Sequence, residues 1–310
     1  MKSGSRRGCE LNLRLVASLV VVVEEGHFGR AADRLFVTAP ALSQQIRRLE
    51  EQVGASLLDR SVHPVTLTEA GELFLPQARE CLDSADRAMN VLDALDRRRS
   101  RRLRIGFING AAGSLGREVL DSLHSEVELV QLDWTQQVSA VAGAMVDASF
   151  VRPPLPHLDG LVLERIGTEP RVAALPRGHR LADRDVISID ELDGEIQVAS
   201  DSAPAEWVKW WSVDPRPSGV PVTYGRSVRT MDEQLEVVAN GRAVAITAAT
   251  IAEYYTRSDI RFVTITDIEP SSIELCTRQG DLSPAVRELR NAVAVVARRW
   301  NRRSLLGRAS

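Results

Sequence analysis

The chain has 310 residues, a length that suits two or three domains better than one. Hydrophobic residues make up 44% of it, as in ordinary globular proteins, and 39 basic against 42 acidic residues leave a formal net charge of −3. The overall charge therefore does not indicate a nucleic-acid partner, and any field that attracts DNA must be local. An apolar run, Leu15–Val23, is followed by two glutamates, so it predicts a core helix and neither a signal peptide nor a membrane span.

Cysteine and histidine residues show no metal-binding pattern. The three cysteines, Cys9, Cys81 and Cys276, are odd in number and widely spaced, so they predict neither a disulfide framework nor a metal site. The five histidines share no ligand spacing. We therefore expect no metal and no cofactor, and a protein of the reducing cytoplasm without a membrane-spanning segment.

Residues 26–53 predict two short helices joined by a tight turn. Gly26 can adopt the left-handed conformation that ends a preceding helix. The stretch Arg30–Leu35 contains two alanines, which allow another helix to pack closely. Thr38 would then cap a second helix with Pro40 in its first turn, where a missing N–H costs nothing. Spacings of 4, 3 and 4 give this second helix one buried stripe, formed by Leu42, Ile46, Leu49 and Val53. Such a pair indicates a helix-turn-helix.

The polar side chains in and beside this motif are of the kinds that reach base edges and phosphates. The residues 61–67 that follow predict a strand, a turn and a strand, the wing that lies over a DNA backbone. The alternative is a small helical hairpin whose polar face meets only water. The predicted DNA-contacting residues are Arg30, Arg34, Thr38, Ala39, Pro40, Ser43, Gln44, Arg47, Arg48, Arg60 and His63.

This N-terminal stretch closely resembles the DNA-binding domain of LysR-type transcriptional regulators. The matching positions are Arg30–Leu35, Pro40–Glu50, Gly54, Leu57, Arg60 and Leu67–Gly71. The resemblance implies a bacterial winged helix-turn-helix regulator of promoter DNA, associated with the nucleoid.

Two departures from the family pattern affect this motif. The family commonly has Ser-Phe-Thr where this chain has His27-Phe28-Gly29, so we expect the first helix to lose a hydroxyl cap and to be capped by Gly29 instead. A glutamine usual before the proline is Ala39 here. Ala39 would read a thymine methyl group or no base at all.

Residues 68–96 predict a long linker helix with a coiled-coil seam. Alternating spacings of 4 and 3 extend over three heptads, and the small residues among them would let a partner helix approach closely. An approximately palindromic DNA site needs two recognition helices, which favours a homodimer or homotetramer. The alternative is a helix that packs on its own domain. The seam consists of Phe74, Ala78, Cys81, Ala85, Ala88, Leu92 and Leu95.

A short arginine-rich segment follows this helix. It contains Arg97, Arg98, Arg99, Arg101 and Arg102, and we interpret residues 97–102 as a solvated hinge, with an additional contact to DNA phosphate as the alternative.

From Leu103 onward the pattern changes to alternating strands and helices, which predicts a parallel sheet covered by helices. The arrangement resembles the LysR effector domain, itself similar to periplasmic solute-binding proteins. We expect one lobe at 103–163 and 267–302, a second lobe at 164–266, and the DNA-binding domain at 1–67. Strands are predicted at 103–107, 127–132, 148–151, 161–165, 171–175, 196–199, 222–224, 243–247 and 261–268, and helices at 115–124, 138–146, 231–239 and 284–300.

In open α/β sheets, ligands bind beyond the C-terminal ends of the strands. Helix starts near Asn109 and Thr230 would favour an anionic group there, and Arg152 or Arg229 could pair with a carboxylate. The alternative for each residue is that it caps a helix or closes a turn. Trp207, Trp210 and Trp211 are attributed to helix packing. The predicted effector-binding residues are Ile108, Asn109, Gly110, Trp134, Thr135, Arg152, Ser200, Asp201, Ser202, Thr230 and Thr247.

No catalytic constellation is visible in the sequence. The loop Gly110–Gly116 has neither the spacing of a nucleotide-binding loop nor the context of a nucleophile elbow. We therefore predict a regulator and no enzyme, in which a small-molecule effector closes the two lobes and alters DNA binding. Two alternatives remain: a solute-binding sensor without DNA readout, and an enzyme built on the α/β lobes.

Overall fold

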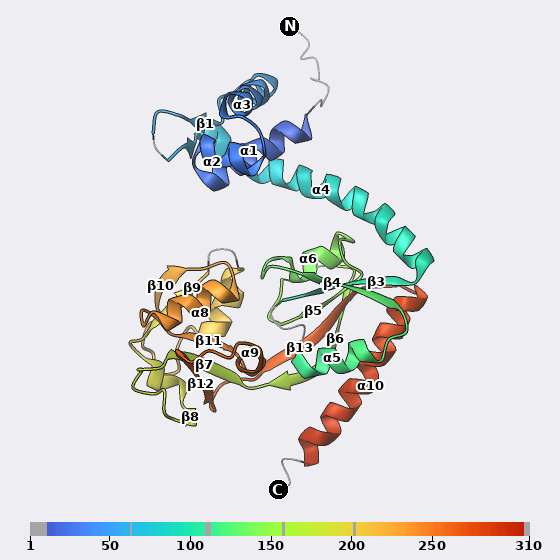
Figure 1. Cartoon of the computed structure of the whole chain (residues 1–310), viewed down its shortest axis with the longest axis vertical. Helices are drawn as coiled ribbons and strands as arrows, with labels where there is room; N and C mark the ends of the chain where they lie inside the picture. The colour runs from blue at the N-terminus through green and yellow to red at the C-terminus, as the bar shows by residue number, and fades with distance from the viewer. Residues whose placement is uncertain (1–10, 63, 109–112, 157–158, 201–202, 307–310) are drawn as a thin grey trace. The chain divides into compact units, whose positions relative to one another are not determined.

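The computed structural model describes residues 11–62, 64–108, 113–156, 159–200 and 203–306 (Figure 1). The chain forms two compact units, Met1–Met89 and Asn90–Ser310. A helical N-terminal unit followed by a two-lobed α/β unit confirms the fold class that the sequence predicts.

The N-terminal unit is built on three short helices, α1 (Leu13–Glu25), α2 (Phe28–Arg34) and α3 (Ala39–Val53). Gly26 ends α1 at φ 60° and Gly54 ends α3 at φ 77°. As expected, the Oγ1 atom of Thr38 accepts a hydrogen bond from the backbone N–H of Ala41 at 3.3 Å. The stripe on α3 is buried at Leu42, Ile46 and Leu49, whereas Val53 is half-buried.

The wing begins earlier than the sequence analysis expects. Strand β1 (Leu58–Asp59) pairs antiparallel with β2 (Thr66–Leu67), so the first strand precedes Arg60 rather than following it. The physical reason is burial, because Leu57 is 1% and Leu58 is 5% exposed in the core of this unit. These two leucines hold strand β1 against the core of the N-terminal unit, before the turn of the wing.

Helix α4 (Glu69–Ser100) is 32 residues long and continues through Pro76. Near its start Leu75 and Ala78 are buried, and near its end Ala94 and Arg97 are buried. The helix therefore covers most of the segment expected to be a hinge.

The interpretation of that segment as solvated is wrong for Arg97, which is buried, whereas Arg98 is exposed but forms an ion pair within the fold. Arg97 is 9% exposed, and its guanidinium donates to the Asp147 carboxylate at 2.9 Å and to the Ala144 carbonyl at 3.0 Å. Arg98 donates to Asp281 at 2.8 Å, and Arg278 bridges Asp147 and Asp281 at 3.2 Å each. We call the three arginines and two aspartates, Arg97, Arg98, Arg278, Asp147 and Asp281, the arginine clamp. The clamp attaches the end of α4 to the first lobe, because carboxylates from distant positions neutralise the arginines.

The first lobe contains a five-stranded sheet in the order β4-β3-β5-β13-β6. Strands β3 (Arg102–Phe107), β4 (Glu126–Gln131) and β5 (Ala148–Val151) are parallel, and β13 (Ser271–Arg278) runs antiparallel to β5 and to β6 (Leu161–Glu169). Helices α5 (Gly113–Asp121) and α10 (Pro284–Leu306) share one core with β3 and β13, whereas α6 (Gln136–Ala142) contributes to another.

The second lobe contains a four-stranded sheet in the order β11-β7-β12-β8. Beside it, β9 (Ile196–Ala199) pairs parallel with β10 (Thr223–Ser227), and Gln197 bridges to Val244. The remaining elements are β7 (Arg171–Pro176), β8 (Val186–Ile187), η1 (Ile189–Leu192), α7 (Ala205–Ser212), α8 (Met231–Ala239), β11 (Ala245–Ala248), α9 (Ala249–Tyr254) and β12 (Ile260–Ile265).

The chain crosses between the lobes twice. The first crossing falls at Pro170, since β6 remains paired in the first sheet up to Glu169. The expected return strand at 261–268 is instead β12 of the second lobe, and the return to the first lobe is made by β13 after a short loop. Strand β13 is missing from the predicted elements because its buried positions include polar residues, Ser271, Glu274 and Thr277.

Candidate functional site

An imidazole caps helix α2. The Nδ1 atom of His27 accepts a hydrogen bond from the backbone N–H of Gly29 at 3.0 Å. The expectation that Gly29 itself serves as the cap is therefore wrong, because the ring of His27 does what a hydroxyl does elsewhere. A Cβ atom at position 29 would lie 3.0 Å from Cε1 and 3.1 Å from Nδ1 of His27. The glycine thus leaves room for the capping ring.

Helix α3 presents a polar, positively charged face to solvent. Arg47 and Arg48 are exposed, and neither makes an ion pair or hydrogen bond with any residue that the structure describes. Gln44 is exposed beside them and Ser43 is half-buried. At the start of the helix Thr38, Ala39 and Pro40 are also exposed. This face can therefore approach an anionic polymer without first breaking an internal contact.

The other three predicted arginines are engaged within the unit. Arg34 donates to Glu24 at 2.9 Å and to Glu25 at 3.1 Å, and these two hydrogen bonds raise the pKa of its guanidinium. Arg30 lies 3.5 Å from Glu25. Arg60 is 2.8 Å from Glu50 and stacks over the Phe28 ring. His63 lies outside the described residues.

The turn between α2 and α3 carries a feature that the sequence analysis misses. Phe36 is 96% exposed and has a φ of 53°, a conformation that is strained for a bulky residue. Its ring stands free beside the start of α3. The identity of the residue gives no sign of this exposure, since phenylalanine is usually buried.

The predicted seam on α4 divides into two parts. Ala78 is buried and Phe74 packs against the core of the N-terminal unit, as the alternative interpretation expects. Cys81 and Ala88 are exposed and Ala85 is half-buried, while Leu92 is 60% and Leu95 is 43% exposed. The later part thus leaves an apolar row without a partner among the described residues.

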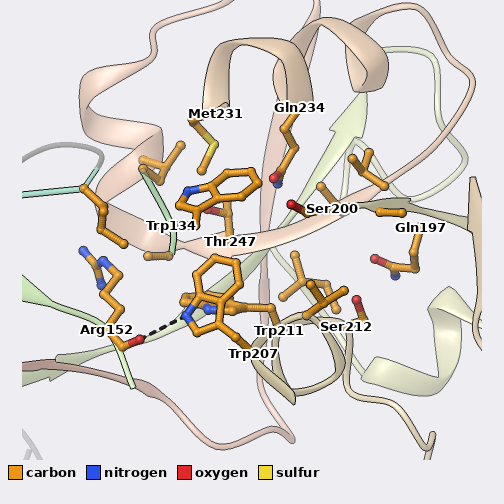
Figure 2. Close-up of a pocket in the computed structure, with 18 residues that line it drawn as sticks. Trp134, Arg152, Gln197, Ser200, Trp207, Trp211, Ser212, Met231, Gln234 and Thr247 are labelled. Carbon is orange, nitrogen blue, oxygen red and sulfur yellow. Dashed lines mark hydrogen bonds between the residues drawn. The ribbon is translucent and has the colours of Figure 1, made fainter. Parts of the chain in front are cut away.

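A pocket lies where the two lobes of the second unit meet (Figure 2). It is a narrow cavity of about 50 Å³. The first lobe contributes Ile108, Trp134 and Arg152. The second lobe contributes Gln197, Val198, Ala199, Ser200, Trp207, Val208, Trp211, Ser212, Met231, Gln234, Ala245, Ile246, Thr247, Ala248 and Ile251.

The predicted effector-binding residues fall into three groups. Residues Ile108, Trp134, Arg152, Ser200 and Thr247 line the pocket. Thr135 and Thr230 precede helices α6 and α8 and do not line it, and the Oγ1 atom of Thr230 accepts from the N–H of Glu233 at 3.2 Å. The others, Asn109, Gly110, Asp201 and Ser202, lie outside the described residues.

Arg152 is 5% exposed, and its charge is already balanced. Its Nη1 atom pairs with Glu169, and its Nη2 atom donates to the Oγ1 atom of Thr250 at 3.0 Å. The Glu169 carboxylate also accepts from the backbone N–H of Thr250 at 2.7 Å. The structure therefore does not support the expected pairing of Arg152 with an effector carboxylate. Arg229 is exposed and is not among the lining residues.

A tryptophan cluster forms one wall of the pocket. The centroids of the Trp134 and Trp207 rings are 5.5 Å apart, and those of Trp207 and Trp211 are 5.6 Å apart. Trp207 donates from Nε1 to the Arg152 carbonyl at 3.1 Å. Assigning these rings to packing alone is thus incomplete, because Trp207 and Trp211 pack and also line the pocket.

The neighbouring tryptophan has a different role. Trp210 holds the guanidinium of Arg171 4.0 Å above its ring. Burial lowers the pKa of Arg171 to about 10. Trp210 does not line the pocket.

Two buried hydrogen-bond donors in the pocket lining have no acceptor among the described residues. They are Nε2 of Gln197 and Nε1 of Trp211. Gln197 is 1% exposed and Trp211 is 7% exposed. Neither is predicted by the strand-end rule, since Gln197 lies within β9 and Trp211 on a helix.

The described residues contain no group of three or more His, Cys, Asp or Glu side chains that could hold a metal ion. Within the same residues, no helix is both long and apolar enough to cross a bilayer.

Comparisons with known proteins identify the family. The model for bacterial regulatory helix-turn-helix proteins of the lysR family matches residues 13–72, and the LysR substrate binding domain matches residues 96–297. The Hca operon transcriptional activator HcaR of Escherichia coli (strain K12) is 31% identical, over 93% of this chain and 98% of that protein. The chain belongs to the LysR family. It is therefore a transcriptional regulator with a DNA-binding domain and an effector-binding domain.

Further similar proteins show how far the likeness extends. AlsR of Bacillus subtilis (strain 168) is 35% identical over 63% of this chain and 66% of that protein. Among solved structures, full-length CbnR in complex with its target DNA has a TM-score of 0.54 at 23% identity, covering 92% of this chain and 99% of that one. A full-length OxyR variant from Pseudomonas aeruginosa has a TM-score of 0.52 at 19% identity, covering 92% and 100%. These two structures share the fold.

Proposed function

We propose that this regulator reads promoter DNA with the exposed face of α3 and that a small molecule in the interlobe pocket controls it. The observation that carries the DNA-binding part is that Arg47 and Arg48 are exposed and unpaired within the described part of the chain. Guanidinium groups on a recognition helix bind phosphate and guanine edges in the major groove. CbnR, which shares this fold, was crystallised with its target DNA, which supports the same use here.

The test is fluorescence-anisotropy binding to the DNA upstream of the gene, against scrambled DNA, across a salt series. We expect preferential binding whose affinity falls steeply with salt, because each neutralised phosphate releases counterions. Arg47→Ala should weaken binding and reduce the salt slope by about 1. Arg117→Ala removes the same charge from an exposed position on α5 and should change neither quantity.

Equal affinity for both DNAs at every salt concentration would contradict the proposal. It would favour the alternative of a solute-binding sensor without DNA readout. The proposed role requires binding and no catalysis, and it is exercised in the bacterial cytoplasm.

For the assembly, we infer a homodimer through the exposed row of α4, with pairs of dimers forming a tetramer. The support is the unpartnered apolar row that ends at Leu92 and Leu95. Leu92→Asp should abolish the dimer in light scattering, because a buried charge opposes helix pairing. Leu73→Asp changes an exposed leucine off the row and should leave the dimer intact. A dimer that persists in Leu92→Asp would contradict this assembly.

A further inference from the structure

The pocket offers no unpaired positive charge from the described residues. Arg152 is the one charged side chain in its described lining. The guanidinium already pairs with Glu169 and donates to Thr250. A carboxylate that entered the pocket would therefore lose its hydration without gaining a new counter-ion, which is unfavourable in a buried site.

The walls of the pocket are aromatic and aliphatic. The rings of Trp134, Trp207 and Trp211 lie in sequence along one wall. Met231, Ile108 and Ile251 add apolar surface. Figure 2 shows Trp134 beside Trp207, with Met231 above them. Flat ring faces favour a flat ligand, because stacking adds to the free energy of burying apolar area.

The two donors without acceptors define the polar requirement. A buried N–H without a partner carries an unfavourable desolvation cost, and no acceptor among the described residues reaches Gln197 Nε2 or Trp211 Nε1. The donor of Trp207 is already used by the Arg152 carbonyl. A ligand that supplies acceptor atoms to Gln197 and Trp211 would remove this cost, so part of its affinity would come from satisfying them.

We propose that the effector is an uncharged, flat aromatic molecule that carries a carbonyl or similar acceptor and binds on the tryptophan wall. The acceptor takes a hydrogen bond from Trp211 Nε1 or from Gln197 Nε2. This inference rests on the proposed function for the location of the effector, and it replaces the anionic effector that the sequence suggests.

The test uses matched probes that differ in charge or in aromaticity. Benzamide and indole-3-carboxamide are compared with benzoate and indole-3-carboxylate, and cyclohexanecarboxamide is the non-aromatic control. Binding to the full chain is measured by isothermal titration calorimetry and by quenching of tryptophan fluorescence. We expect each amide to bind at least about tenfold more tightly than its carboxylate, since the charged partner must be desolvated. The non-aromatic amide should bind more weakly than benzamide.

Donor variants test the hydrogen bonds separately. At least one of the substitutions Gln197→Met and Trp211→Phe should weaken amide binding about tenfold. Gln197→Met should also raise the melting temperature of the empty protein, because it removes a buried donor that has no partner. Gln279→Met makes the same change at an exposed position and should alter neither quantity.

Three results would overturn the inference. They are tighter binding of a carboxylate, unchanged amide affinity in both donor variants, and no binding of any probe at millimolar concentration. Anisotropy measurements with upstream DNA on the same preparation separate this inference from the proposed function. Retained DNA binding without probe binding rejects the effector class alone, whereas amide binding without DNA preference rejects the proposed DNA readout alone.

Discussion

The arginines of the two units serve different purposes, although the sequence presents them alike. On α3 of the N-terminal unit, Arg47 and Arg48 are exposed and have no partner among the residues that the structure describes. In the second unit Arg97, Arg152 and Arg278 are paired with carboxylates and shielded from solvent. The difference shows that an arginine count does not locate a nucleic-acid surface. The position of the nearest carboxylate decides whether a guanidinium is available to a partner.

The largest expected effect comes from breaking the arginine clamp. Asp147→Ala should reduce the free energy of unfolding by about 3–5 kcal/mol, because it leaves Arg97 and Arg278 buried without their shared counter-ion. Urea denaturation of the full chain checks this. Asp183→Ala, at an exposed position, is the control and should change stability little. Equal stability of the two variants would mean that the clamp does not stabilise the fold.

A smaller effect, dependent on pH, is expected at Asp281 of the clamp. Burial raises the pKa of its carboxyl. The hydrogen bonds from Ser283 and the charges of Arg98 and Arg278 lower this pKa, and together they outweigh burial, so the net shift is downward. A lowered folded-state pKa contributes stability above about pH 4 that is lost as the pH falls through the folded-state value. Asp281→Asn should cost about 1.5–3 kcal/mol at neutral pH.

The difference between wild type and Asp281→Asn should shrink in acid. Thermal melts between neutral pH and the strongly acidic range provide the measurement. A difference that stays constant down to the lowest pH would refute the role of this carboxylate.

Freeing a paired arginine in the N-terminal unit tests whether ion pairing limits its contact with DNA. Glu24→Gln with Glu25→Gln removes both carboxylates that hold Arg34, and with them the one that lies beside Arg30. We expect DNA affinity to rise several-fold and the salt slope to steepen by about 1. Glu69→Gln with Glu72→Gln makes the same charge change on α4. If both double variants raise affinity equally, only net charge has acted, and the pairing of Arg34 is irrelevant.

The hydrogen bond from Gly29 to the His27 ring is expected to add about 1 kcal/mol to the free energy of unfolding. His27→Ala should destabilise the N-terminal unit by that amount, because the N–H of Gly29 loses its acceptor. His27→Ser restores a hydroxyl acceptor and should recover most of the loss. Chemical denaturation followed by circular dichroism provides the measurement, and a serine variant as unstable as the alanine variant would argue against capping.

The smallest effect concerns backbone strain at Phe36. Phe36→Asn should stabilise the N-terminal unit by about 0.5–1 kcal/mol, since asparagine tolerates a positive φ better than phenylalanine. Denaturation of this variant beside wild type is the measurement. A loss of stability would show that the exposed ring makes a favourable contact.

The fold could be predicted from the sequence where periodicity is strong. The apolar spacing on α3 predicts its buried stripe. The alternation of strands and helices predicts β5, β9 and α8 with the bounds that the structure shows. Strand β13 could not be recognised, because buried polar residues interrupt its pattern. Two of these residues are hydrogen-bonded to distant parts of the chain, Ser271 to Arg152 and Glu274 to Arg165, and no local pattern contains such contacts.

The candidate site could be predicted only in part, for a similar reason. The strand-end rule found pocket residues such as Trp134 and Arg152, yet it could not reach residues that α7 and α8 turn toward the pocket. Nor could it foresee that Arg152 is paired with Glu169, 17 positions away, or Arg97 with Asp147, 50 positions away. Such pairs depend on tertiary structure.

The contact between His27 and Gly29 restricts the order in which these two positions can change during evolution. A Cβ atom at position 29 would press on the imidazole that caps α2, so Gly29→Thr is unfavourable while His27 is present. If His27→Ser comes first, a hydroxyl cap replaces the ring and the second change has room. A mutational path from this chain to the Ser-Phe-Thr pattern is therefore open when position 27 changes first and hindered when position 29 changes first.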